Sequence, residues 1–434
     1  MKKKINKEII KLSVPNILSN ISVPLLSTVD TILMGGLSST HLAAVGLGSF
    51  LFNVIYWNFG FLRMGTTGMT AQNYGANDKD EVWLSLLRAG VLAITLAILL
   101  LFLQSPIYEL AKSALVVSAE NDPLILEYFK VRIWAAPAAL MMMVVMGWLF
   151  GMQNAIYPLV LTIIINVVNI LTSFYLVKIA GLDVRGVALG TVIAQYTGLI
   201  IGLVLIFKKY QTYINWSLSY RLSILSEYSR FLKVNFDIFL RTFCLTFSFG
   251  FFYRQSSKLG DVVLAVNVVL MQFVNWMSYG IDGFAYATES LVGKYKGADK
   301  PKEVKMVIGQ SFLWGGVVSL IYAAVYYIFG LELFRLFTDD PSLLTVGKEL
   351  LYFIALFPIL GFTSYIWDGI FVGLTATASM RNAMILALIT YLVSFYLIPE
   401  TSNGSNVWTA LSIFLIARAV FQWGYYQKYG LAMK

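Results

Sequence analysis

Long apolar runs recur along the chain from end to end, separated by short segments of Gly, Pro, Asn and charged residues. Many runs hold about 20 residues or more, which is the length that a helix needs to cross a hydrocarbon core of roughly 30 Å. The pattern therefore predicts an all-α polytopic membrane protein. It predicts twelve transmembrane helices, near residues 13–36, 42–72, 82–104, 123–151, 157–178, 186–207, 231–256, 262–293, 304–330, 345–373, 380–398 and 405–426.

The two halves of the chain match when the sequence is shifted by 222 residues without a gap. Gly75 then falls on Gly297, and Gly151 of WLFGMQN falls on Gly373 of IFVGLTA. One offset serves loops and helices that lie far apart in the sequence, so the match indicates a true internal repeat. An even number of helices repeats in one orientation, which predicts a pseudo-symmetry axis along the membrane normal.

The repeat predicts two pseudo-symmetric six-helix lobes, an N-terminal lobe at 1–207 and a C-terminal lobe at 231–434. The polar and aromatic stretch at 208–230 is expected to be a cytoplasmic linker between them. Two parallel bundles that face each other form a cleft, and rocking one against the other gives alternating access. The topology therefore predicts a transporter.

Composition and charge fit this interpretation. Hydrophobic residues make up 58% of the chain and charged residues only 13%, against about 25% charged in soluble domains. Of the 32 Lys and Arg residues, 20 fall on the side of the predicted termini, nine opposite and three inside spans. The positive-inside rule then predicts a multi-pass protein of the cell membrane with both termini in the cytoplasm. Topology explains the net charge of +9, so we expect the lipid bilayer and no nucleic acid as partner.

Several functional classes are excluded by what the sequence lacks. A single cysteine, Cys244, and a single histidine, His41, provide neither a disulfide framework nor a zinc site. No HExxH, GxSxG or phosphate-binding loop is present, so we expect no enzymatic activity and no cofactor.

Asp30 stands inside the apolar run around STVDTILMGGL at 27–37. A charged Asp at the centre of a membrane helix costs about 2.5–3.5 kcal/mol on insertion scales. One interpretation is a structural carboxylate that bridges to Arg63 or to neighbouring hydroxyls. The other is an ion-coupling site, because burial disfavours the charged form and would let Asp30 load and release a proton.

The fifth span supplies polar side chains that could accompany Asp30. Asn166, Asn169 and Ser173 in IIINVVNILTSF have spacings of 3 and 4, so they share one face of a helix. Thr191, near the start of the sixth span, belongs to the same half. Amides and hydroxyls inside spans can also simply hold helices together, and for any one of them alone that is the simpler explanation.

Other polar residues inside the spans leave alternatives open. Asp282, Glu289 and Asp368 are alternative coupling acids in the C-terminal half. Asp237 and Arg241 are four residues apart, which predicts a salt bridge within one helix. The candidates for the lining of a substrate cleft are Arg63, Asn166, Met146 and Arg241.

At these residues the sequence resembles a known family. STVDTILMGGLSSTHLAAVGLG, GMQNAIYPLVLTIIINVVNILTSF and VRGVALGTVIAQ are similar to the multidrug and toxic compound extrusion (MATE) transporters. NFDIFLRT, YGIDGFAYATESLVGKYKGA and WDGIFVG resemble its DNA-damage-inducible, DinF-type branch. The resemblance covers essentially the whole chain, including the twelve spans and the two lobes.

The resemblance implies efflux of organic, often cationic and amphipathic compounds, driven by inward flow of H⁺ or Na⁺. It matches the coupling acid of the family to Asp30, and its partners in the fifth and sixth spans to Asn169 and Thr191. A second acid that is frequent in the fifth span of the family falls on Ser173. Because hard cations prefer charged oxygen ligands, this departure favours H⁺ over Na⁺ held by Asp30, Asn169 and Thr191.

A lipid-linked oligosaccharide flippase of the same wider superfamily is the alternative function. Such a protein is expected to line its cleft with several basic residues for a pyrophosphate. Only Arg63, Arg241 and Arg418 lie within spans here, so an antiporter of small organic molecules is the better prediction. We expect it to act as a monomer.

Overall fold

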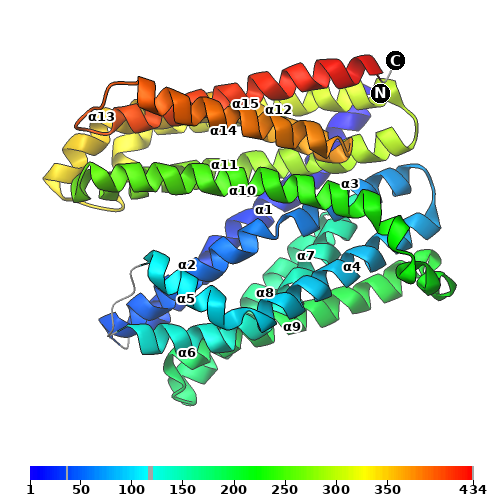
Figure 1. The fold of residues 1–434 in the computed structure, drawn as a ribbon, viewed down its shortest axis with the longest axis horizontal. Coiled ribbons are helices and arrows are strands. Elements are labelled where there is room, and N and C mark those ends of the chain that lie inside the picture. The colour runs from blue at the N-terminus through cyan, green and yellow to red at the C-terminus, as the bar shows by residue number, and fades with distance from the viewer. Residues whose placement is uncertain (36–37, 116–120, 433–434) are drawn as a thin grey trace. The chain divides into compact units, whose positions relative to one another are not determined.

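The computed structural model describes residues 1–35, 38–115 and 121–432, except for the side chains at 23–32, 34–35, 39, 114–115, 225 and 429–432. Across the described residues all regular secondary structure is helical (Figure 1). The α-helices are α1 (Lys2–Gly35), α2 (Ser39–Asn58), α3 (Phe61–Gly75), α4 (Lys79–Phe102), α5 (Gln104–Leu115), α6 (Asp122–Arg132), α7 (Ala136–Gly151), α8 (Ile156–Phe174), α9 (Asp183–Lys209), α10 (Ser229–Lys258), α11 (Asp261–Gly297), α12 (Pro301–Arg335), α13 (Pro341–Gly373), α14 (Thr377–Leu397) and α15 (Ser405–Ala432).

The predicted fold class is confirmed. Eleven helical stretches of the described residues are long and apolar enough to cross a membrane, and the 34-residue α1 accounts for the remaining predicted span. Two predicted spans are interrupted: α2 and α3 are separated at Phe59 and Gly60, and the 3₁₀ turn Ile133–Ala135 joins α6 to α7. α5 lies between predicted spans, and the pattern of long apolar runs gave no sign of it.

The helices follow the internal repeat closely. The stretch from the start of α2 to the end of α3 covers residues 39–75, and α11 covers 261–297, so both ends agree with the offset of 222. Non-glycine residues with positive φ follow the helix ends in matching pairs, Asn77 with Asp299 and Gln153 with Thr375. The repeat therefore extends to the left-handed residues at which the chain turns.

Two glycines related by the repeat bring helices into backbone contact. A Cβ atom on Gly147 of α7 would lie 2.4 Å from the carbonyl oxygen of Arg63 on α3. A Cβ atom on Gly369 of α13 would lie 2.3 Å from the carbonyl oxygen of Ala285 on α11. Only glycine permits these approaches, so each half packs its central helix pair in the same way.

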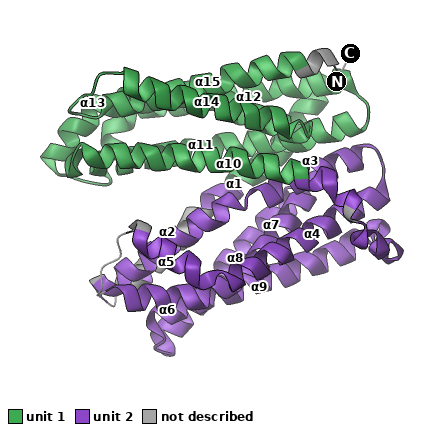
Figure 2. Cartoon of the chain, in the orientation of Figure 1, with its two compact units in different colours: residues 1–17, 233–434 green, residues 18–232 purple. Residues whose placement is uncertain are grey.

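The chain divides into two compact units (Figure 2). Unit 1 comprises residues 1–17 and 233–434, and unit 2 comprises residues 18–232. The predicted lobes placed all of the first helix with the N-terminal half, whereas here α1 is shared and its first half belongs to unit 1. The start of α1 and the end of α15 lie at the same end of unit 1 (Figure 1).

The first half of α1 is held to unit 1 by packing and polar contacts. A Cβ atom on Gly283 of α11 would meet the Ser13 carbonyl oxygen at 3.0 Å, so α1 lies directly against this helix. Lys294 Nζ is 3.3 Å from Glu8 Oε2, and Tyr295 donates a hydrogen bond of 2.8 Å to the same oxygen. These contacts fix the start of α1 on α11.

The predicted linker forms three short 3₁₀ helices, Gln211–Tyr213, Trp216–Ser223 and Leu225–Tyr228, in unit 2. Arg221 pairs with Glu227 at 3.0 Å and with Glu81 of α4 at 2.9 Å, and Arg88 of α4 pairs with the same two carboxylates. The hydrogen bond to Glu227 raises the pKa of Arg221 above its ordinary value. A closed network of two arginines and two glutamates therefore connects the linker to the first turns of α4.

Candidate functional site

Asn169 and Thr191 form the centre of the polar cluster that the sequence predicted in the first half. Asn169 Nδ2 donates a hydrogen bond of 2.9 Å to Thr191 Oγ1, which joins α8 to α9. Thr191 in turn donates to the Val187 carbonyl oxygen at 3.1 Å, so its hydroxyl orientation is fixed. Both side chains are buried, with exposures of 0% and 2%.

Ser173 belongs to the same cluster because α9 comes close to α8 at Gly190. A Cβ atom at Gly190 would lie 2.2 Å from Ser173 Oγ and 2.8 Å from the Ser173 backbone nitrogen, which only glycine avoids. The glycine thus places the buried Ser173 beside the turn of α9 that carries Thr191. We name Asn169, Ser173 and Thr191 the α8–α9 polar cluster.

Two oxygen atoms of this cluster have unused hydrogen-bonding capacity. Among the described residues, neither Asn169 Oδ1 nor Ser173 Oγ has a hydrogen-bond partner, although both atoms are buried. Leaving a buried polar atom unpaired costs about 1–3 kcal/mol, so each such atom calls for an explanation such as a bound water, an ion or a proton donor. Both oxygens can accept a hydrogen bond from a protonated carboxyl group or coordinate a cation.

The second half of α1 is joined to α8 by two polar contacts. Ser19 Oγ lies 2.9 Å from Thr162 Oγ1, and Asn166 Nδ2 donates a hydrogen bond of 2.9 Å to the Ser22 carbonyl oxygen. Both contacts advance in the same direction along the two helices, so α1 and α8 run parallel there. Asn166 therefore connects two helices, and its predicted place in a substrate cleft stays a prediction.

Asp30 lies in the helical part of α1, but its side chain is outside the described residues. Its predicted neighbour Arg63 lies on α3, where its guanidinium carbon is 5.9 Å from the centre of the Phe150 ring on α7. Met146 is half-buried on α7, beside the Gly147 that packs on Arg63. Arg63 therefore lies in the α3–α7 contact, and the predicted places of Arg63 and Met146 in a substrate cleft stay predictions.

Asp368 in unit 1 is the centre of a second buried group, which we name the Asp368 cluster. Its carboxylate accepts hydrogen bonds from Arg241 of α10, from Arg418 of α15 at 2.8 Å and from Gln422 of α15 at 2.7 Å. All four side chains are buried, with exposures from 1% to 9%. Three donors, two of them cationic, thus surround this one carboxylate and compensate its charge.

The other acids of unit 1 lie along α11. Asp282 interacts electrostatically with both Arg241 and Arg418, so the Asp368 cluster faces a second negative charge. Glu289, two turns further along α11, is buried with an exposure of 1%. As coupling acids, both remain predictions.

The salt bridge predicted between Asp237 and Arg241 is wrong. Asp237 pairs with Arg381 of α14 and accepts a hydrogen bond of 3.0 Å from Thr377, while Arg241 pairs with Asp368. A spacing of four permits a pair within one helix, but the two side chains find partners on other helices instead.

Some members of the Asp368 cluster were not predicted from the sequence. The sequence pattern identifies Arg418 only as a basic residue in a span and makes no prediction for Gln422. A usable signal existed, since Arg418 and Gln422 are four residues apart and so share one face of α15. Only the tertiary structure shows which acid this face meets.

Comparisons with known proteins place the chain in a clear context. The MatE family model matches it twice, over residues 15–175 and 238–399. DNA damage-inducible protein F of Escherichia coli (strain K12) is 33% identical to it over 416 residues, covering 96% of this chain and 90% of that protein. The probable multidrug resistance protein NorM of Thermotoga maritima is 24% identical over 81% of this chain and 76% of that protein.

The same fold is found among solved structures. The crystal structure described as MATE in the bent conformation has a TM-score of 0.89 and 22% identity to this chain. The alignment covers 99% of this chain and 96% of that one. At this level of identity the likeness concerns the fold.

Proposed function

Because the chain belongs to the MatE family, whose members are transport proteins and not enzymes, we propose that it is a secondary active multidrug efflux antiporter. It exports organic compounds, cationic or amphipathic, by alternating access in exchange for H⁺. The family resemblance expected from the sequence, DinF-type branch included, is confirmed by the family model and by the Escherichia coli relative.

The α8–α9 polar cluster carries this proposal through its register with α1. Ser19 is in contact with Thr162, and eleven residues further along each parallel helix come Asp30 and Ser173. Eleven residues make three turns of helix, about 16 Å, and return to nearly the same face. This register supports a site in which the Asp30 carboxyl group meets the unpartnered oxygens of Asn169 and Ser173.

Proton coupling is favoured by the chemistry of these partners. A protonated Asp30 can donate a hydrogen bond to Asn169 Oδ1 or to Ser173 Oγ. The oxygen that accepts this bond would then have a hydrogen-bond partner. A Na⁺ ion held by Asp30, Asn169 and Thr191 would have one charged ligand and two neutral ones. Because hard cations prefer charged oxygens, we assign H⁺ to the site and keep Na⁺ as the alternative ion.

Among the C-terminal acids, Asp368 fits the coupling role less well than Asp30. Loading a proton on Asp368 would remove the charge that compensates Arg241 and Arg418 in a buried site. Arg241 and Arg418 are two of the three basic residues that could line a flippase cleft, and both are paired with Asp368. No observation therefore favours the flippase.

In the proposed cycle, Asp30 takes up a proton while the site is open to the outside. α1 then shifts or bends at Pro24, the cargo is released, and the proton leaves to the cytoplasm. Ion and drug need only bind the two conformations with different affinity. We propose that the termini lie in the cytoplasm, as the distribution of Lys and Arg indicates, and that one chain is sufficient for transport.

Transport of ethidium in proteoliposomes tests the proposal, with pH and Na⁺ gradients imposed separately. We expect the pH gradient alone to drive transport, and Asp30→Asn to abolish it. Asp339→Asn removes an exposed carboxylate before α13 and serves as the matched control, with transport unchanged. If only the Na⁺ gradient drives transport, the coupling ion is Na⁺ and not H⁺. If transport survives Asp30→Asn, the coupling residue is one of the other acids. No transport under either gradient would contradict the antiporter.

A further inference from the structure

The chain passes between the two units twice, and each time it does so inside a continuous helix. α1 changes from unit 1 to unit 2 after Ile17, near its middle. α10 begins at Ser229 and changes from unit 2 to unit 1 after Leu232, within its first turn. A helix is held by its own backbone hydrogen bonds, so neither connection is a flexible loop.

Aromatic contacts hold the start of the linker on unit 2. Trp216 stacks on Phe207 of α9 with 6.1 Å between the ring centres. The same ring meets the buried Trp83 of α4 edge-on at 5.3 Å. Tyr210 meets Trp148 of α7 edge-on at 5.0 Å. Three helices of unit 2 therefore contact this part of the linker.

Ion pairs hold the end of the linker, directly before α10. Glu227 pairs with Arg221 at 3.0 Å and with Arg88 of α4, which is only 4% exposed. Both arginines also pair with Glu81 of α4 at 2.9 Å. We name Glu81, Arg88, Arg221 and Glu227 the linker clamp. Because α10 begins at Ser229, two residues after Glu227, the linker clamp fixes the start of α10 on unit 2.

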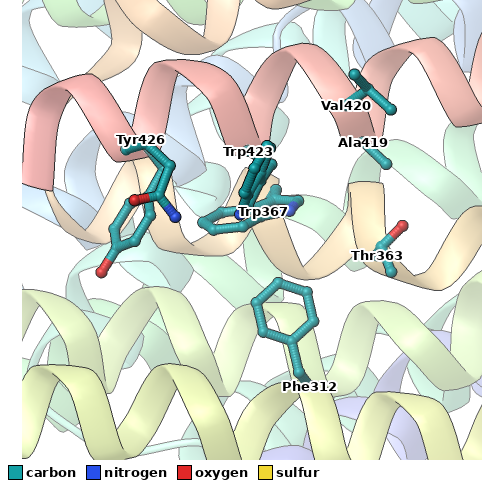
Figure 3. A pocket seen from close by; sticks show the side chains of 8 residues that line it. Phe312, Thr363, Trp367, Ala419, Val420, Trp423 and Tyr426 are labelled. Carbon is teal, nitrogen blue, oxygen red and sulfur yellow. The ribbon is translucent and has the colours of Figure 1, made fainter.

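Helices of unit 1 that do not cross are held together by aromatic packing. Figure 3 shows Trp367 of α13 in a groove that α12, α13 and α15 line. Its ring centre is 5.0 Å from that of Phe312 on α12 and 4.9 Å from that of Tyr426 on α15. Closely packed side chains transmit strain and absorb little of it. Bending is therefore expected where the chain crosses between the units, and not within this bundle.

We propose that the linker clamp stays closed throughout the transport cycle, and that the chain bends at Leu232–Lys233 of α10 and at Ile17–Leu18 of α1. The closed linker acts as a strap that keeps the first turn of α10 on unit 2. A movement of unit 1 must then bend α10 beyond this turn. A released linker would instead let the whole of α10 follow unit 1. This inference rests on the alternating access proposed above.

A cross-link tests whether the strap has to open during transport. Asn215 donates a hydrogen bond of 3.3 Å to Asp80 at the surface. In a Cys244→Ser background, Asn215→Cys with Asp80→Cys can be joined by a short bismaleimide, which leaves the linker clamp intact. We expect the cross-linked protein to transport ethidium as fast as the same variant without reagent. Each single-cysteine variant treated with the reagent is the control. Loss of transport in the cross-linked protein alone would overturn the proposal.

Weakening the linker clamp tests whether the strap is needed. Glu227→Gln removes one carboxylate from both arginines, so we expect transport to fall several-fold. The cross-link between positions 80 and 215, added to this variant, should restore transport. Glu332→Gln removes an exposed carboxylate of α12 and should leave transport unchanged. Wild-type transport by Glu227→Gln, or a loss that the cross-link does not restore, would overturn the strap.

Trypsin cleavage after Arg221 reports on the linker clamp without any transport. Cleavage requires the linker to leave α4, so we expect it to be slow in the wild type and several-fold faster in Glu227→Gln. The cross-link should slow it again. Equal cleavage of wild type and Glu227→Gln would overturn the clamp. A wild type that resists trypsin but does not transport ethidium would contradict the antiporter and still support the clamp.

Discussion

At the scale of single residues, the two polar clusters differ in what their side chains leave unused. In the Asp368 cluster both carboxylate oxygens have donors, and the charges of Asp368 and Arg418 neutralise each other at 2.8 Å. The unpartnered atoms of this cluster are Arg241 Nε, Arg418 Nε and Gln422 Oε1, among the described residues. In the α8–α9 polar cluster, Asn169 Oδ1 and Ser173 Oγ lack partners among the described residues. The Asp368 carboxylate is already occupied by three donors, while the free acceptor oxygens of the α8–α9 polar cluster can respond to an added proton or ion.

The Asp368 cluster should therefore act in stability more than in coupling. Asp368→Asn leaves the charge of Asp282 alone to compensate two buried guanidinium groups, and breaking a buried pair costs roughly 3–5 kcal/mol. We expect the melting temperature in detergent to fall by several degrees, while transport driven by a pH gradient persists per folded molecule.

A double variant separates lost charge balance from lost packing. Asp368→Asn combined with Arg418→Gln should lose less stability than the sum of the two single variants, because one excess charge is removed. Additive losses would show that charge compensation does not explain the effect. Loss of transport in a stable Asp368→Asn protein would assign coupling to this acid.

Gly190 provides a residue-scale test of the α8–α9 polar cluster. Gly190→Ala would place a methyl group 2.2 Å from Ser173 Oγ and against the Ser173 backbone, so α8 and α9 must separate. We expect a loss of about 1–3 kcal/mol, as for overpacked cores, together with loss of transport. Gly46→Ala is the matched control, because no atom lies within 4 Å of its new Cβ. Equal melting temperatures for the two variants would contradict the close contact.

At the scale of helices, the register of α1 on α8 is the basis of the proposed site. Disulfide formation measures it, in a background with the buried Cys244 replaced by Ser. Asp30→Cys with Ser173→Cys should cross-link under mild oxidation, because the proposed register would bring the two Cβ atoms within reach. In the pair Asp30→Cys with Thr162→Cys the two positions are eleven residues out of register, a separation of about 16 Å along the helix axes, so this pair should not cross-link. Cross-linking in the second pair alone would mean a different register.

The sequence predicted the number and order of the spans because length and apolarity suffice for a membrane helix. It did not predict the interruption between α2 and α3, since Phe59 and Gly60 lie in a run as apolar as its neighbours. Spacings of 3 and 4 placed Asn166, Asn169 and Ser173 on one face of α8, while Thr191 as the partner on α9 came from the family resemblance. No spacing predicted the Asp368 cluster, because its members come from three helices whose packing no local pattern encodes.

At the scale of the whole molecule, the repeat and its one exception are both informative. The offset of 222 holds for helix ends, left-handed residues and packing glycines, so both halves fold by the same rules. α1 departs from this regularity because its residues up to Ile17 belong to unit 1, while its second half belongs to unit 2 with the α8–α9 polar cluster. A helix shared in this way couples the unit with the proposed ion site to the other unit.

Glu8 should therefore matter for transport more than for stability. Glu8→Ala removes its ion pair with Lys294 and its hydrogen bond with Tyr295, at partly exposed positions that contribute only about 1 kcal/mol. We expect a melting temperature close to that of the wild type, with ethidium transport reduced several-fold because the start of α1 no longer moves with α11. Lys3→Ala, at an exposed position of the same helix, should leave both quantities unchanged. Wild-type transport by Glu8→Ala would mean that unit 1 does not transmit its motion through the start of α1, and that the second half of α1 responds to the proton within unit 2 alone.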